Sequence, residues 1–227
     1  MLIGNQLRTI RIILFFVVIS FNCFELSAQS LFETSFAKGK WNQNEWIMVK
    51  SPRWCYLGKW IQKYSFIENK IPESTMSKEN PISFTSMVLK NKFTVGISIK
   101  VKMEFADRMA PLIVIAQELG KNKYGYSEYR EHFEIVLWDN GSNIWHHYFE
   151  DNKPSWKLVA YNRFPLKANT EYELEVKYLK RKTDKILVVL VDGYEFGYVD
   201  NSLPNEFYIG ITGCEGANRF YNIEIRK

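Results

Sequence analysis

The sequence predicts an all-β protein, an antiparallel sandwich of two sheets, and three observations support this prediction. Residues 170–178, TEYELEVKY, alternate apolar and charged side chains, as a strand does when one side faces the core and the other faces solvent. Short segments rich in β-branched and aromatic residues recur along the chain, separated by turn residues. No segment shows a sustained helical period. Together these features favour a sandwich or barrel over a helical protein.

The N-terminus has the pattern of a secretory signal peptide. Arg8 and Arg11 precede the apolar run IILFFVVISF, residues 12–21, and the small and polar residues LSAQS follow at 26–30. This run is shorter than the ~20 residues that span a bilayer. We therefore expect residues 1–28 to be a cleaved signal peptide, with an uncleaved N-terminal anchor as the alternative. Cleavage implies a periplasmic or secreted protein without a membrane span.

Residues 29–227 are expected to form one domain. The predicted strands cover residues 94–103, 111–118, 132–138, 142–149, 155–161, 170–178, 185–191, 194–199, 206–213 and 219–226. Asp192-Gly193 is the turn of a hairpin between two of them. No internal repeat or long linker divides the 199 residues that follow the signal, which are enough for one sizeable core.

The charge balance makes nucleic acid a poor candidate partner. Residues 1–28 hold two of the 30 basic and one of the 25 acidic residues, which leaves 28 against 24 and a net charge of +4. The excess is spread along the chain, with no basic tail. It would suit an acidic polysaccharide. Cys55 and Cys214 remain after cleavage, either as one disulfide or as two buried thiols.

Two segments resemble a known family. The C-terminal segment LVVLVDGYEFGYVDNSLPNEFYIGITGCEGANRFYNIEIRK resembles the closing strands of concanavalin A-like jelly rolls, the laminin-G and lectin/glucanase superfamily. The early segment NEWIMVKSPRWCYLGKWIQKYS is similar to the first strands of secreted jelly-roll proteins from bacteria that degrade polysaccharides. The resemblance implies a jelly-roll sandwich and a polysaccharide or oligosaccharide partner. The resemblance does not indicate which activity the protein has, because lectins, hydrolases and lyases all occur with this fold.

A hairpin at residues 132–149, HFEIVLWDNGSNIWHHYF, holds every histidine of the chain. Asn140-Gly141 is a strong signal for a two-residue type I′ turn, which predicts that Glu134 lies directly opposite His147. One side is then apolar and should face the core, with Phe133, Ile135 and Leu137 beside Ile144, His146 and Tyr148. The other side should carry His132, Glu134, Val136 and Trp138 beside Asn143, Trp145, His147 and Phe149.

The second side of this hairpin is the predicted saccharide site, because indoles stack on sugar rings and charged groups bond hydroxyls. The predicted binding residues are Tyr126, His132, Trp138, Asn143 and Trp145. For an enzyme, a lyase or hydrolase, the candidate catalytic residues are Glu134, His147, Tyr129 and Arg130. The alternatives are ordinary core packing for the tryptophans and surface decoration for the Glu–His pair.

Other patterns predict no cofactor or metal. Adjacent histidines in a strand point to opposite faces, so His146 and His147 cannot readily hold one zinc ion. Turn geometry accounts for Asp139, Asn140 and Asp192, which could otherwise suggest calcium. The alternating Glu171, Glu173 and Glu175 resemble the paired carboxylates of jelly-roll hydrolases, but the partner aspartate is absent, and a solvated face is expected.

Three functions remain open: a non-catalytic glycan-binding protein, a polysaccharide lyase or hydrolase, and a structural envelope protein. Affinity for a polysaccharide without a change in its chain length distinguishes the first. New reducing ends or an unsaturated uronate distinguish the second. A protein that binds no glycan would fit the third.

Overall fold

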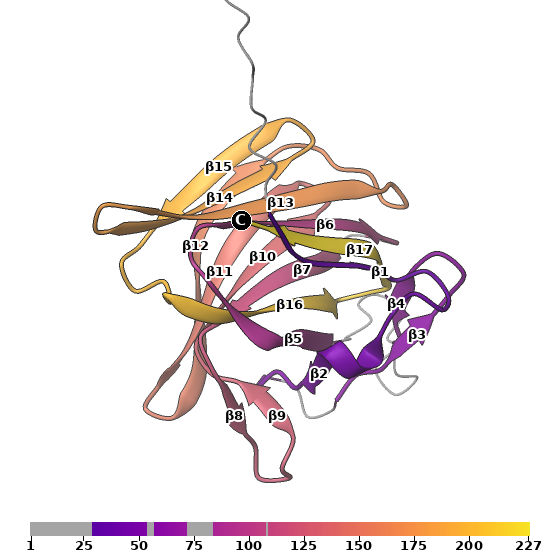
Figure 1. The fold of residues 1–227 in the computed structure, drawn as a ribbon, viewed down its shortest axis with the longest axis horizontal. Coiled ribbons are helices and arrows are strands. Elements are labelled where there is room, and N and C mark those ends of the chain that lie inside the picture. The colour runs from indigo at the N-terminus through magenta and orange to yellow at the C-terminus, as the bar shows by residue number, and fades with distance from the viewer. Residues whose placement is uncertain (1–28, 54–56, 72–83, 108) are drawn as a thin grey trace, which may run out of the picture.

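The computed structural model describes residues 29–53, 57–71, 84–107 and 109–227. The predicted signal peptide, residues 1–28, and Cys55 lie outside these residues. The described chain forms two large antiparallel sheets packed face to face, with one short 3-10 helix, η1 (Gln43–Glu45) (Figure 1). The predicted all-β sandwich is confirmed. Within the described residues, no helix is long and apolar enough to cross a membrane.

The first sheet has eight strands, including both ends of the described chain. Its order is β15 (Tyr194–Val199), β14 (Asp184–Val191), β13 (Tyr172–Arg181), β6 (Ile97–Phe105), β17 (Asn218–Arg226), β4 (Ile67–Asn69) and β3 (Trp60–Gln62), and β1 (Ser30–Ser35) also pairs with β17. Chain neighbours β13, β14 and β15 form a meander, whereas β6 and β17 are brought together from distant parts of the sequence.

The second sheet has seven strands and carries the candidate site. Its order is β12 (Lys153–Arg163), β11 (Gly141–Glu150), β10 (His132–Trp138), β7 (Met109–Ala116), β16 (Glu206–Cys214), β5 (Phe84–Thr94) and β2 (Trp46–Val49). A separate hairpin of β8 (Leu119–Lys121) and β9 (Ser127–Tyr129) projects from this layer (Figure 1).

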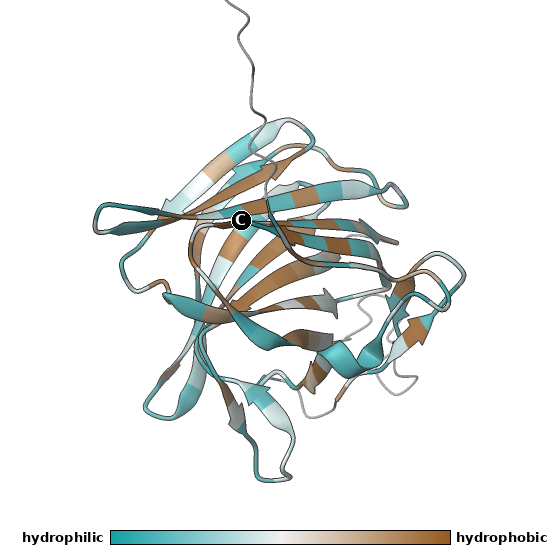
Figure 2. Cartoon of the chain, viewed as in Figure 1, coloured by the Kyte–Doolittle hydropathy of each residue, from teal (hydrophilic) through white to brown (hydrophobic). Residues whose placement is uncertain are grey.

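The main core lies between the two sheets. On β13, Leu174, Val176 and Tyr178 are fully buried, while Glu173 on the opposite side is exposed, as the alternation predicts. Side chains from β6, β7, β10, β14 and β16 complete this core. Figure 2 shows the same division, with hydrophobic segments concentrated on the central strands and hydrophilic ones on the projecting turns.

A second apolar cluster lies on the other face of the seven-stranded sheet. It includes Val88, Leu112, Val114 and Val136, with Tyr129 of β9 packed against them. Because Lys50 pairs with Glu128 of β9, the β8–β9 hairpin is held over one part of this face. The central strands of this sheet are therefore buried against the main core on one face, and the other face is covered only in part.

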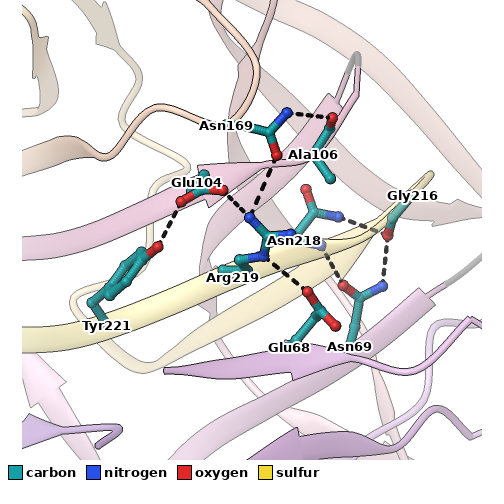
Figure 3. A network of polar contacts seen from close by, with 9 residues as sticks. All are labelled: Glu68, Asn69, Glu104, Ala106, Asn169, Gly216, Asn218, Arg219 and Tyr221. Atoms are coloured by element: carbon teal, nitrogen blue, oxygen red, sulfur yellow. Dashed lines mark hydrogen bonds and ion pairs between the residues drawn. The ribbon is translucent and has the colours of Figure 1, made fainter. Parts of the chain in front are cut away.

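A polar network ties three strands of the eight-stranded sheet together (Figure 3). Arg219 of β17 donates to Glu68 of β4 at 2.9 Å and also pairs with Glu104 of β6, which accepts a further bond from Tyr221. Glu104 is almost fully buried, and its charge is matched by Arg219. The network gives the short strand β4 a polar attachment that its few backbone bonds would not supply alone.

Candidate functional site

The β10–β11 hairpin has a different register from the predicted one. Trp138 pairs with Gly141 and Glu134 with Trp145, so Asp139 and Asn140 form the loop, and the prediction that Glu134 pairs directly with His147 is wrong. Gly141 belongs to the strand, with φ of +132°. A Cβ there would lie 2.1 Å from the carbonyl oxygen of Asn162, so the close approach of β12, as well as the positive φ, requires glycine.

The two faces of the hairpin are nevertheless those predicted. The register differs by two residues, and side chains alternate with a period of two, so no residue changes side. Ile135 and Ile144 pair within the main core and are fully buried. Glu134 and His147 share the opposite face and remain in contact diagonally across the two strands, with His147 Nε2 3.0 Å from Glu134 Oε2.

A cleft of about 440 Å³ opens on this face. Five predicted site residues line it: Glu134, Trp138, Asn143, Trp145 and His147. The other lining residues are Arg53, Ala110, Leu112, Val136, Trp156, Leu158, Tyr161, Arg163, Cys214 and Glu215. Strands β10 and β11 thus supply the floor and β12 one wall.

Four predicted site residues do not line the cleft. Tyr126 is exposed on the β8–β9 hairpin, and Arg130 donates to the carbonyl of Lys121 beside it. Tyr129 is fully buried, and its hydroxyl lies 2.5 Å from Ser86 Oγ. His132 is buried between Tyr129 and His147, with ring centroids 4.6 Å from each. Tyr129 and His132 therefore pack beside the floor of the cleft, on the same face of the sheet.

Glu134 is the centre of a buried charge cluster beneath the cleft. His132 Nε2 lies 3.4 Å from its Oε1, and Arg53 lies 3.7 Å from its Oε2. His132 Nδ1 lies 2.8 Å from the carbonyl oxygen of Arg130 and must donate to it, so the contact with Glu134 is attractive only if Nε2 also carries a proton.

The protonation of this cluster follows from burial and neighbouring charge. Burial would raise the pKa of Glu134, but His147 and His132 outweigh it and hold the pKa well below the ordinary 4.5. Burial lowers the pKa of His147 below 6.5; Glu134 opposes this shift, while His132 and Arg53 add to it. Glu134 is thus ionised at neutral pH, and His147 is neutral.

The wall of the cleft carries exposed aromatic residues that sequence reasoning missed. Trp156 is 48% exposed and Tyr161 57%, whereas Trp145 is half-buried against the outer apolar cluster. A bulge between the Ile144 and Trp145 pairs leaves Val159 as an extra residue in β12. Because of this bulge, Trp156 and Tyr161 face the same side although they are an odd number of residues apart.

Two arginines also line the cleft and were not predicted. The guanidinium of Arg53 lies 5.2 Å from the ring centroid of Trp156, and that of Arg163 lies 5.6 Å from the ring of Tyr161. Arg53 precedes β3 by several residues and carries no sequence motif. For Arg163 the sequence offered one signal. It lies at the end of β12, a strand that contains aromatic residues.

The buried cluster of His132, Glu134 and His147 is not arranged to hold one metal ion. His132, Glu134 and His147 could offer three ligand atoms within 4.8 Å of one another. The two imidazole planes are within 11° of parallel and stacked, so their in-plane lone pairs do not converge on one ion. Cys214 is a buried free thiol whose pKa is raised by burial. Glu171 and Glu173 lie on the solvent face at β13, as expected.

Comparison with known proteins gives a fold but no sequence family. No family model matches the chain, and no curated protein matches it in sequence. In structure it is similar to carbohydrate-binding module CBM66 from Bacillus subtilis, with 12% identity, a TM-score of 0.56, and coverage of 81% of this chain and 96% of that one. It is also similar to κ-carrageenase from Pseudoalteromonas carrageenovora in complex with an oligotetrasaccharide, with 7% identity, a TM-score of 0.57, and coverage of 92% and 98%.

A winged bean acidic lectin in complex with methyl-α-D-galactose is a third similar structure, with 9% identity, a TM-score of 0.55, and coverage of 88% of this chain and 98% of the lectin. All three have the concanavalin A-like jelly-roll fold. The chain therefore has this fold, as the resemblance of its strands predicted. At such identities the likeness concerns the fold alone.

Proposed function

We propose that the protein is an exported carbohydrate-binding protein that holds an oligosaccharide in the cleft on the seven-stranded sheet. The observation that carries this proposal is the pair of exposed rings, Trp156 and Tyr161, on one wall of a cleft of about 440 Å³. Aromatic faces of this kind stack on sugar rings, and the volume lies within the ~300–1,000 Å³ of small-ligand sites. Two of the similar structures are a carbohydrate-binding module and a lectin, which supports the same class of ligand.

Burial of the charged floor favours binding over catalysis. The side chains of Glu134 and His147 are only 4% and 7% exposed, and each is already engaged with the other. A glycoside hydrolase of the usual kind needs two carboxyl groups on either side of the scissile bond. Two carboxylates line the cleft, but Glu134 is buried in contact with His147, and Glu215 is exposed. The floor is therefore better suited to holding hydroxyl groups in place.

A uronate lyase is the second candidate, favoured by one observation. Arg53 lies beside both Glu134 and Trp156, where it could neutralise a sugar carboxylate while neutral His147 accepts a proton. Tyr129 and Arg130, which were the expected lyase residues, do not line the cleft. New absorbance from an unsaturated product would establish this activity, and unchanged chain length with retained affinity would exclude it.

Export is the part of the proposal that rests on sequence alone. Arg8, Arg11 and the apolar run at residues 12–21 support a signal peptide removed after Ala28, with the protein in the periplasm or outside the cell. N-terminal sequencing of the cell-fractionated protein tests this. An N-terminus near Gln29 is expected, and an intact leader on protein from a soluble cytosolic fraction would contradict it.

The binding proposal is tested with a polysaccharide panel and two matched variants. Trp156→Ala should weaken the affinity of a bound glycan about fivefold or more, the equivalent of ~1 kcal/mol for one aromatic stacking contact, with little change in melting temperature. Tyr64→Ala removes a ring that is 87% exposed outside the cleft and should leave affinity unchanged. Equal affinities for Trp156→Ala and the wild type, or no binding across the panel, would refute the proposal and favour a structural role.

A further inference from the structure

Two arginine side chains in the cleft, Arg53 and Arg163, make few hydrogen bonds or ion pairs with the described residues. Arg53 is 23% exposed, and its Nε is buried without a hydrogen-bond partner among the described residues. Its closest approach to a carboxylate is 3.7 Å, to Glu134, which is longer than a hydrogen bond. An arginine with five donors is seldom placed in a cleft with so few of them satisfied.

The carboxylate near Arg53 has two closer partners. His147 and His132 approach Glu134 at 3.0 and 3.4 Å, closer than Arg53 does. The guanidinium of Arg53 lies over the indole of Trp156 at the cleft wall. Because Arg53 approaches Glu134 only at 3.7 Å, its hydrogen-bond donors remain available to a ligand that lies on Trp156.

Arg163 repeats this arrangement farther along β12. Its side chain is exposed over the ring of Tyr161, and within the described part of the chain no carboxylate lies within 4.0 Å of it. The other carboxylate that lines the cleft, Glu215, is exposed, and no described cation pairs with it. Each exposed ring of the wall thus has a guanidinium beside it.

We propose that the bound saccharide is anionic, and that Arg53 and Arg163 bind its carboxylate or sulfate groups while Trp156 and Tyr161 stack on its rings. This inference rests on the proposed function and names the ligand class of the same cleft. A planar guanidinium can donate two parallel hydrogen bonds to a carboxylate or sulfate, which an ammonium cannot do. The net charge of +4 on residues 29–227, 28 basic against 24 acidic residues, further favours approach of a polyanion.

Matched charged and neutral ligands test this proposal. Calorimetric titration would compare an oligouronate with its methyl ester, and a sulfated galactan oligosaccharide with its desulfated form. At least one charged form should bind about tenfold or more tightly than its neutral counterpart, with an affinity that falls as salt rises. The pair that shows the difference identifies the anion as carboxylate or sulfate.

Three variants separate specific contacts from general charge. Arg53→Gln and Arg163→Gln should each weaken binding of the charged ligand about tenfold and leave the neutral form unaffected. Arg181→Gln removes the same charge from a distant turn of the other sheet and should have no effect. A melting curve checks that each variant folds, and Arg163→Gln alone suffices should Arg53→Gln not fold.

Two outcomes overturn this proposal and are distinguishable. If neutral and charged forms bind equally, or if both folded cleft variants match the wild type, the anionic ligand class is wrong while saccharide binding stands. If neither the charged nor the neutral oligosaccharides bind, and no polysaccharide of the broader panel binds, both this proposal and the proposed function are wrong.

Discussion

Replacing Glu134 with glutamine tests how the buried charges beneath the cleft stabilise the sheet. The side chain is 4% exposed and contacts His147, His132 and Arg53 at 3.0, 3.4 and 3.7 Å. Glutamine keeps the shape and one acceptor oxygen but removes the negative charge. His147, His132 and Arg53 would then lose the buried carboxylate that all three contact.

The size of the effect follows from the class of interaction. Removing one partner of a buried ion pair costs about 3–5 kcal/mol, and the acceptor retained by glutamine places Glu134→Gln near the lower end, at about 3 kcal/mol. In a domain of this size each kcal/mol lowers the melting temperature by about 2–4 °C, so a decrease of roughly 6–12 °C is expected. Urea denaturation followed by tryptophan fluorescence gives the free energy of unfolding directly.

A surface glutamate provides the control for this measurement. Glu173 pairs with Lys100 at 3.2 Å but is 60% exposed, so Glu173→Gln should cost less than about 1 kcal/mol. If Glu134→Gln is no more destabilising than Glu173→Gln at neutral pH, the cluster is not a compensated set of charges. The argument for an ionised Glu134 would then be wrong.

Two further predictions concern the core and the pH dependence. Ile135→Ala should cost about 2–5 kcal/mol by opening a cavity, because Ile135 is fully buried, while the remaining folded protein binds its glycan with unchanged affinity; a stable variant would show that Ile135 faces solvent. Since burial lowers the pKa of His147 below 6.5, the unfolded chain takes up this proton first, and stability should decrease as pH falls below about 6.5. His147→Gln should flatten this decrease in denaturation curves between pH 7.5 and 5.5, and an unchanged slope would contradict the assignment.

The sequence predicted the faces of the β10–β11 hairpin but not the pairs across it. The alternation of apolar residues predicted Ile135 in the core and Glu134 on the opposite face. Because side chains alternate with a period of two, an even shift of register leaves each residue on the same face. The turn signal at Asn140-Gly141 misplaced the loop by one residue, because Gly141 was required by the contact with Asn162 on another strand. A contact between residues that are distant in sequence leaves no pattern in the local sequence.

The cleft wall was beyond prediction for a similar reason. Regular alternation in β12 would place Trp156 and Tyr161 on opposite faces, and only the bulge at Val159 brings them together. Arg53 reaches the cleft from a segment far from β12 in sequence, so no spacing could indicate it. The residues that line the cleft were therefore only partly predictable, whereas His132 and Tyr129, which were predicted for the site, are buried and do not line it.

The position of β12 in its sheet gives the two sides of the cleft different mobility. Strand β10 has a neighbour on each side, whereas β12 is the edge strand and pairs only with β11 within its sheet. Amide hydrogens along the free edge of β12 should exchange with solvent far sooner than those of β10. The buried groups of the floor would then keep their positions, while the edge strand adjusts its rings and Arg163 to ligands of differing shape on the nanosecond-to-microsecond timescale. Such a cleft would have one fixed side and one adaptable side.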